Sequence, residues 1–122
     1  MIVDLQGSDR WQVIDELVDY LISSGKIQLA HRDSIIAAVR KRELSMSTGI
    51  GFGVGIPHAS TNLVSEVIEV MGRSKNGINF DSLDGKLVHK VVLFLVPTGQ
   101  FQKHADILAN IAKRLHKTDF WS

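Results

Sequence analysis

The sequence contains no cysteine, and this absence excludes several kinds of chemistry at once. Disulfide bonds, thiolate catalysis and thiolate metal sites all require that side chain. The absence fits a reducing compartment. No internal repeat, linker or low-complexity tract divides the 122 residues, so we expect one domain over residues 1–122 with its own hydrophobic core.

Long hydrophobic runs and an excess of one charge are also missing. No apolar stretch approaches the roughly 18 residues of a membrane span, and the first residues lack the basic and apolar blocks of a secretory signal. We therefore expect a cytoplasmic protein with no direct membrane insertion. The formal net charge is +1 and no basic stripe is visible, so we expect no nucleic-acid partner.

Hydrophobic periodicity predicts helices that alternate with strands. Helices are expected from a cap at Ser8 to a stop at Gly25, over 32–43 with capping oxygens from Asp33 and Ser34, and over 102–116. Strands are expected within 53–56, over 67–71, over 91–96 and briefly over 78–80, whereas residues 1–5 suit either a short strand or a loose end. Asn76-Gly77 and Asp84-Gly85 indicate turns.

The strand over 91–96 is apolar at every position, which is typical of a strand buried on both faces. Helices that alternate with strands, joined by short loops, then favour layers packed on a sheet. The predicted fold class is therefore α/β, a single layered domain in which a mixed β-sheet is flanked by helices.

Residues 42–58 are the most informative segment of the chain. Glycines occupy the alternate positions 49, 51, 53 and 55, and the segment ends on Pro57 and His58. Glycine permits backbone conformations and close approaches that other residues do not. We interpret the segment as a reactive histidine in a glycine-lined depression.

His104 is the second candidate among five histidines. It stands at the start of the last predicted helix, four residues before Leu108, which places its side chain on the inward face. A polar ring there needs a partner, and a helix N-terminus favours nearby negative charge. The histidines at 31, 89 and 116 are interpreted as surface or structural residues.

Several known site motifs are absent around His58. No Gly-Lys-Ser or Gly-Lys-Thr closes the glycine run, position 54 is valine where a dinucleotide fingerprint needs glycine, and no nucleophile-elbow serine or zinc-protease helix appears. Two interpretations remain open. One is a metal site of His58, His104 and a further carboxylate; the other is histidine as a covalent nucleophile for a phosphoryl group. In the second, Arg42, Ser47, Thr48 and His104 would hold the phosphoryl oxygens.

The pattern Arg-Glu, Ser-Thr-Gly, a glycine-rich stretch and Pro-His resembles the signature of phosphotransferase-system enzyme IIA domains of the fructose–mannitol type, which include a nitrogen-regulatory branch. The resemblance extends over about residues 8–120. It also rests on three later segments and the helix that follows them: Gly77-Ile78-Asn79-Phe80-Asp81, Asp84-Gly85-Lys86, and Leu95-Val96-Pro97 before His104.

The resemblance implies roles for particular residues. His58 would accept the phosphoryl group on Nε2, His104 would hydrogen-bond the phosphate, and Arg42 would stabilise its charge. Ser47, Thr48 and Gly49 would bind phosphate, and no cofactor or metal is implied. The donor would be the histidine phosphocarrier protein HPr or a paralogue, and the acceptor a IIB domain or a regulatory target protein.

The chain departs from the family pattern at both ends, where it looks short, and at position 55. Family members usually continue for one more helix, so we expect a IIA-like domain that lacks the usual C-terminal helix, as a trimmed, excised or minimal form. Position 55 is glycine where relatives often carry alanine, and we expect alanine to be tolerated there. Sugar transport and regulation both remain open, with the lack of an attached IIB or membrane domain favouring regulation. A binding module that kept the fold without phosphotransfer is the alternative.

Overall fold

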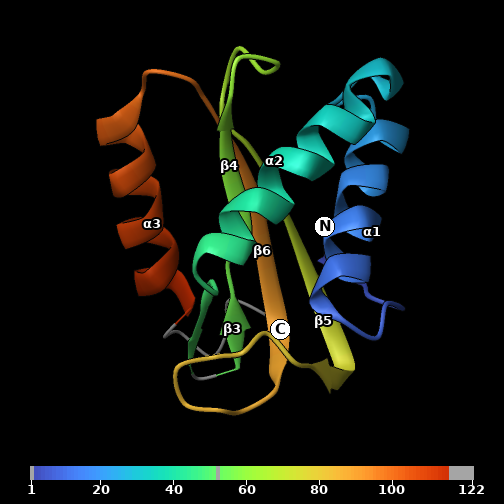
Figure 1. Cartoon of the computed structure of the whole chain (residues 1–122), viewed down its shortest axis with the longest axis vertical. Helices are drawn as coiled ribbons and strands as arrows, with labels where there is room; N and C mark the ends of the chain where they lie inside the picture. Colours follow the sequence, from blue (N-terminus) through green and yellow to red (C-terminus); the bar gives the residue numbers. More distant parts are fainter. Residues whose placement is uncertain (1, 52, 116–122) are drawn as a thin grey trace.

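A computed structural model describes residues 2–51 and 53–115 of the chain (Figure 1). The elements in chain order are β1 Ile2–Asp4, α1 Arg10–Ser23, a 3-10 turn η1 Leu29–His31, α2 Arg32–Ser45, β2 Gly49–Gly51, β3 Val54–Gly55, β4 His58–Thr61, β5 Ile68–Ile78, β6 Val88–Pro97 and α3 Phe101–Leu115. Within these described ranges, no helix has both the length and the apolar character that crossing a membrane requires.

The described strands form one mixed sheet in the order β1-β5-β6-β3-β2, and β4 pairs with β6 outside this path. β5 and β6 are antiparallel and form the centre of the sheet. β3 and β4 both run parallel to β6, one after the other along the same edge, so that Val54 lies opposite Lys90 and His58 opposite Phe94. The predicted mixed sheet is confirmed.

Helices cover both faces of this sheet. Figure 1 shows α1 and α2 on one side and α3 on the other, in three layers. Two hydrophobic cores result: Leu93 and Leu95 of β6 face α1 and α2, whereas Val92 and Phe94 face α3. Each fully buried side chain of this size contributes about 1.5–3 kcal/mol relative to exposure. The prediction of a strand over 91–96 that is buried on both faces is confirmed.

The ends of α1 differ from the prediction by one residue. Asp9, in an extended conformation, is the N-cap and accepts a 2.8 Å hydrogen bond from the Gln12 N–H, so the assignment of the cap to Ser8 is wrong. The N–H and the hydroxyl of Ser8 instead donate hydrogen bonds to Oε1 of the Gln12 side chain. At the other end Gly25 has φ +80° and donates to the Ile22 carbonyl, which confirms it as the stop signal.

The start of α2 follows directly from η1. Its N-cap is His31, which makes no side-chain capping bond, so the predicted caps from Asp33 and Ser34 are wrong. The preceding 3-10 turn already fixes the entry of the chain into the helix. Arg32 pairs with Asp19 of α1 at 2.6 Å, and this hydrogen bond raises the pKa of the Arg32 guanidinium. The pair links the first turn of α2 to α1.

β5 is longer than the strand predicted over 67–71, because Asn76-Gly77 forms a bulge and not a turn. The register of β5 on β6 shifts between Arg73 and Ile78, and Gly77 has φ +87° with its N–H bonded to the Ser74 hydroxyl. A bulge and a tight turn both need a residue with positive φ, so the same dipeptide suits both.

The connection from β5 to β6 contains one correct prediction and one wrong one. β5 ends at Ile78, so the brief edge strand expected over 78–80 does not form. The turn at Asp84-Gly85 is confirmed, because Gly85 has φ +69° and its N–H donates to the Ser82 carbonyl at 3.0 Å. The Asp84-Gly85 turn thus reverses the chain shortly before β6 begins at Val88.

Gly55 packs directly against the fully buried ring of Phe80. A Cβ at position 55 would lie 2.9 to 3.2 Å from three ring carbons, which is closer than van der Waals contact allows. These contacts argue against the expectation that alanine is tolerated at position 55. We expect Gly55→Ala to lower the free energy of unfolding by about 1–3 kcal/mol, measured by urea denaturation.

The matched control for Gly55→Ala uses the contact itself. In a Phe80→Leu background the ring is gone, so the added methyl group has room. The double variant should then lose less than the sum of the two single losses. Strictly additive losses would contradict a clash between position 55 and Phe80.

Candidate histidine site

His58 is the first residue of β4, and its ring lies against Phe94 on the neighbouring strand. The ring centroids are 4.8 Å apart and the planes are inclined by 3°, a stacked arrangement. The parallel register places the two residues opposite each other, and the residue is only 3% exposed. Phe94 therefore fixes the plane of the imidazole.

The Nδ1 atom of His58 lies 2.7 Å from the carbonyl oxygen of Ile56. A carbonyl oxygen only accepts hydrogen bonds, so Nδ1 must carry the hydrogen. In the neutral ring the lone pair is then on Nε2. The backbone two residues earlier thereby sets the tautomer in which Nε2 is the nucleophilic nitrogen.

A depression of about 480 Å³ lies beside His58, between α2 and β4. Its lining residues are Ala38, Lys41, Arg42, Ser45, His58, Ala59 and Ser60. Arg42 thus lines the same depression as His58, as the resemblance implies, and Lys41 adds a second cation. Arg42 also donates from Nη1 to the Met46 carbonyl at 2.9 Å, which anchors the guanidinium at the end of α2.

The described depression that includes His58 is lined by residues of α2 and β4 and by no glycine, so the prediction of a glycine-lined depression is wrong for it. Gly51 and Gly53 border a different cavity, with residues 83–87 and His89. They have φ of +97° and +77°, conformations that glycine adopts readily. The glycines shape the path of β2 and β3, and Gly55 admits the ring of Phe80.

The predicted phosphate-binding residues Ser47, Thr48 and Gly49 have partners inside the protein. The Ser47 hydroxyl donates to the Phe80 carbonyl and accepts from the Gly49 N–H. The N–H and the hydroxyl of Thr48 donate to Glu43 at 2.9 Å and 2.5 Å. These bonds fix the turn that follows α2, and phosphate binding by the three residues stays a prediction.

Position 104 lies in the first turn of α3, as predicted, but the His104 side chain lies outside the described part of the structure. Its inward orientation and its role therefore stay predictions. Among the side chains that are described, no three of His, Asp or Glu gather as a metal site. That statement does not extend to a set that includes His104.

The buried ion pair of Glu43 with Arg10 is the feature near residues 42–58 that sequence reasoning missed. Glu43 is 1% exposed, and its Oε2 lies 3.3 Å from Nη1 of Arg10. Arg10 also donates to the Phe80 carbonyl and to Asp81, and its guanidinium lies 4.5 Å from the centroid of the Trp11 ring. Nothing in the sequence pattern pairs position 10 with position 43, because only the fold brings α1 and α2 together.

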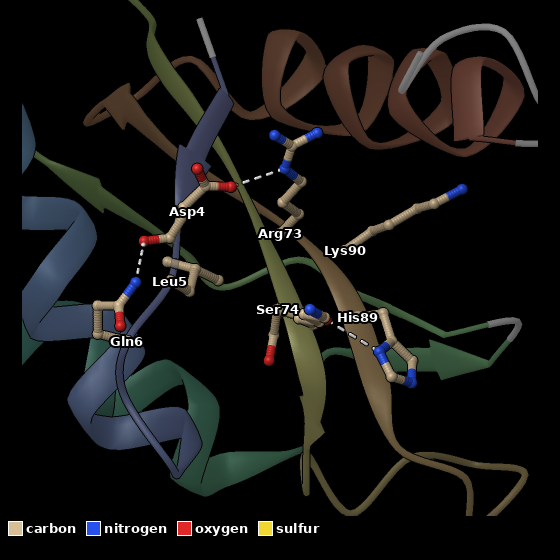
Figure 2. A pocket seen from close by; sticks show the side chains of 8 residues that line it. Asp4, Leu5, Gln6, Arg73, Ser74, His89 and Lys90 are labelled. Atoms are coloured by element: carbon tan, nitrogen blue, oxygen red, sulfur yellow. Dashed lines mark hydrogen bonds and ion pairs between the residues drawn. The ribbon is translucent and has the colours of Figure 1, made fainter.

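A second groove of about 670 Å³ lies near β1, at the ends of β5 and β6 away from His58 (Figure 2). Figure 2 shows the 2.7 Å ion pair of Arg73 with Asp4 and the 2.9 Å contact of His89 Nδ1 with the Ser74 carbonyl. This groove shares no lining residue with the depression at His58. It is the larger of the two, so size alone does not identify the histidine site.

The sequence matches known proteins along its whole length. Residues 1–122 match the family described as the phosphoenolpyruvate-dependent sugar phosphotransferase system, EIIA 2. The fructose-specific EIIA component of Haloferax volcanii is 36% identical over 87% of this chain and 68% of its own length. The nitrogen regulatory protein of Bradyrhizobium diazoefficiens is 33% identical over 94% of this chain and 73% of its own. The chain spans only 18% of the fructose-specific EIIABC component of Bacillus subtilis, at 33% identity.

Solved structures share the fold. The nitrogen regulatory protein IIA-Ntr of Neisseria meningitidis superposes with a TM-score of 0.83 at 24% identity, over 97% of this chain and 79% of that one. The IIA mannitol protein of Escherichia coli superposes with a TM-score of 0.79 at 14% identity, over 97% of this chain and 81% of that one. The fold and the family match agree with the resemblance in residues 42–58, and the chain belongs to the type-2 enzyme IIA family of the phosphoenolpyruvate-dependent phosphotransferase system.

Proposed function

We propose that this chain is a phosphohistidine carrier that accepts a phosphoryl group from HPr or a paralogue on Nε2 of His58. The observation that supports the proposal most is the bond from His58 Nδ1 to the Ile56 carbonyl, which leaves the lone pair on Nε2. The depression that His58 helps to line also carries Lys41 and Arg42, whose charges favour the approach of a phosphorylated donor. Tautomer and charge are thus both suited to phosphoryl transfer.

The chemical step needs only the donor and the imidazole. The Nε2 lone pair forms a bond to phosphorus while the P–N bond of the donor phosphohistidine breaks, and the donor ring keeps that electron pair. Positive charge develops on the His58 ring, and the Ile56 carbonyl stabilises it through Nδ1–H. Positioning and charge neutralisation contribute most of the catalysis in such transfers.

The other predicted site residues extend this proposal. His104 would hydrogen-bond a phosphoryl oxygen, and Arg42 would neutralise its charge. Phosphate binding by Ser47, Thr48 and Gly49 would require their donors to exchange the internal partners that they have in this structure.

The proposed partners are an HPr-type carrier and either a IIB domain or a regulatory target. One structure with the same fold, at a TM-score of 0.77 and 13% identity, is a complex of enzyme IIA mannitol with phosphorylated enzyme IIB mannitol of Escherichia coli. Relatives named for fructose-specific transport and for nitrogen regulation match at similar identity. The family match therefore supports the relay and leaves the acceptor to experiment.

The test is phosphorylation of the purified chain by phosphoenolpyruvate, enzyme I and HPr, followed by intact mass. We expect a gain of one acid-labile phosphoryl group. Addition of a fructose-type IIB domain then separates the roles, because loss of the group indicates transport and its retention indicates regulation. No gain from a donor pair that phosphorylates a known IIA domain would contradict the relay and favour a binding module without phosphotransfer.

Replacement of Arg42 by glutamine should slow transfer on the order of 10²-fold, because it removes a cationic donor from the phosphoryl group. Lys41→Gln is the matched control: Lys41 is exposed in the same depression, so its loss should act mainly on association and its salt dependence. Quench-flow from phosphorylated HPr at several salt concentrations measures both. An Arg42→Gln effect no larger than that of Lys41→Gln would contradict a role for Arg42 in the transfer step.

A further inference from the structure

A continuous series of hydrogen bonds joins the carboxylate of Glu43 to the ring of His58. The Thr48 N–H donates to Glu43 Oε2 at 2.9 Å, and the Thr48 carbonyl accepts the Ile56 N–H at 3.1 Å. The Ile56 carbonyl then accepts Nδ1–H of His58 at 2.7 Å. Two backbone residues therefore transmit the position of a side chain at the end of α2 to the imidazole.

Every member of this series is buried. Glu43, Thr48, Ile56 and His58 are exposed by 1%, 4%, 2% and 3%. Hydrogen bonds are stronger in such surroundings than in water, and a broken one finds no water to replace it. A shift at Glu43 is therefore passed along the series and not absorbed by solvent.

Arg10 holds the carboxylate at the start of the series. A buried carboxylate is unfavourable unless it is paired and hydrogen-bonded. Glu43 meets this need with Arg10 Nη1 at 3.3 Å and with both donors of Thr48. Arg10 is itself fixed by the Phe80 carbonyl. The carboxylate thus has one defined position, between α1, α2 and the turn that follows α2.

We propose that Glu43, held by Arg10, is a positioning residue that acts through Thr48 and Ile56 to keep the lone pair of His58 on Nε2. The chemistry is at His58 alone, and Glu43 touches neither the donor nor the phosphoryl group. When Glu43 loses its hold on Thr48, the Ile56 carbonyl moves away from Nδ1 and the ring populates the tautomer with hydrogen on Nε2. That tautomer has no lone pair on Nε2 with which to attack phosphorus. The inference deepens the proposed function and rests on it for its effect on rate, whereas the tautomer is measured without any phosphorylation.

The test uses Glu43→Gln, which removes the charge at nearly constant shape, and Thr48→Val, which removes only the hydroxyl. Nitrogen-15 NMR of the imidazole reports the tautomer. We expect wild-type His58 to show hydrogen on Nδ1 and Glu43→Gln to show a mixture. Thr48→Val should shift the tautomer in the same direction but less, because valine keeps the backbone N–H bond to Glu43 Oε2. Transfer from phosphorylated HPr should fall on the order of tenfold, because the reacting nitrogen is no longer held in place. Thr48→Ser keeps the hydroxyl and should restore hydrogen on Nδ1, a readout that needs no phosphorylation.

Val13→Ala is the control for stability alone, since Val13 is fully buried in the core that faces α1 and α2 and takes no part in the series. It should lower stability and leave the His58 ring spectrum unchanged. The inference is overturned if wild-type His58 carries its hydrogen on Nε2, if folded Thr48→Val leaves tautomer and rate unchanged, or if Val13→Ala shifts the tautomer equally. If Glu43→Gln does not fold, the His58 tautomer in folded Thr48→Val is the measurement that tests the inference. If wild-type His58 carries its hydrogen on Nδ1 but is never phosphorylated, the proposed function is refuted. The positioning of His58 by Glu43 would still hold.

Discussion

His58→Ala is expected to gain no phosphoryl group from phosphorylated HPr, a loss of at least about 10³-fold relative to the unaltered chain. The variant removes the nitrogen that forms the covalent bond, so no remaining interaction with the donor can replace it. Intact mass after incubation with phosphoenolpyruvate, enzyme I and HPr measures the result. The group should be acid-labile in the unaltered chain and absent from the variant.

Two other histidines serve as controls for this result. His89 is exposed and lines the separate groove near β1, so His89→Ala should be phosphorylated at the normal rate. His104→Gln should slow the transfer while the label stays on His58. Because the ring of His58 stacks on Phe94, circular dichroism must first show that His58→Ala is folded. A folded His58→Ala that still gains the phosphoryl group would place the acceptor elsewhere.

The sequence predicts those elements whose hydrophobic pattern lies within the element itself. β6 is apolar at each position from 91 to 96, and it is buried on both faces because helices cover both sides of the sheet. β4 was missed because its sequence, His-Ala-Ser-Thr, has no strand pattern of its own. It forms because β6 offers a free edge beyond β3, with Ala59 opposite Leu95. Pairing with an existing strand overrides weak local preference.

The site could be predicted in part for a similar reason. His58 follows from the motif, and its partner Ile56 is only two residues away in the chain. The depression that His58 helps to line depends on long-range packing, because α2 supplies one wall and no glycine is among its described lining residues. The pairing of Arg10 with Glu43 spans 33 residues, and it exists only because α1 and α2 pack side by side. Such contacts leave no spacing signal in a single sequence.

The contribution of that pairing to stability can be measured with Arg10→Ala. The variant leaves the Glu43 carboxylate, which is buried, without its cation. Removal of one partner from a buried ion pair costs about 3–5 kcal/mol of unfolding free energy. For a domain of this size, a loss of that magnitude lowers the melting temperature by roughly 10–20 °C. Urea denaturation and thermal unfolding should both show it.

Arg32→Ala is the matched control, because it removes the same side chain from an exposed ion pair with Asp19. Solvent screens that pair, so its loss should cost about 0–1 kcal/mol. Addition of Glu43→Gln to Arg10→Ala should recover part of the stability, since the neutral amide no longer needs a cation. If Arg10→Ala and Arg32→Ala lose equal unfolding free energy, solvent must stabilise the Glu43 carboxylate when Arg10 is absent. Recovery in the double variant would mean instead that the cation of Arg10 is what allows a charged carboxylate to stay buried between α1, α2 and the turn that follows α2.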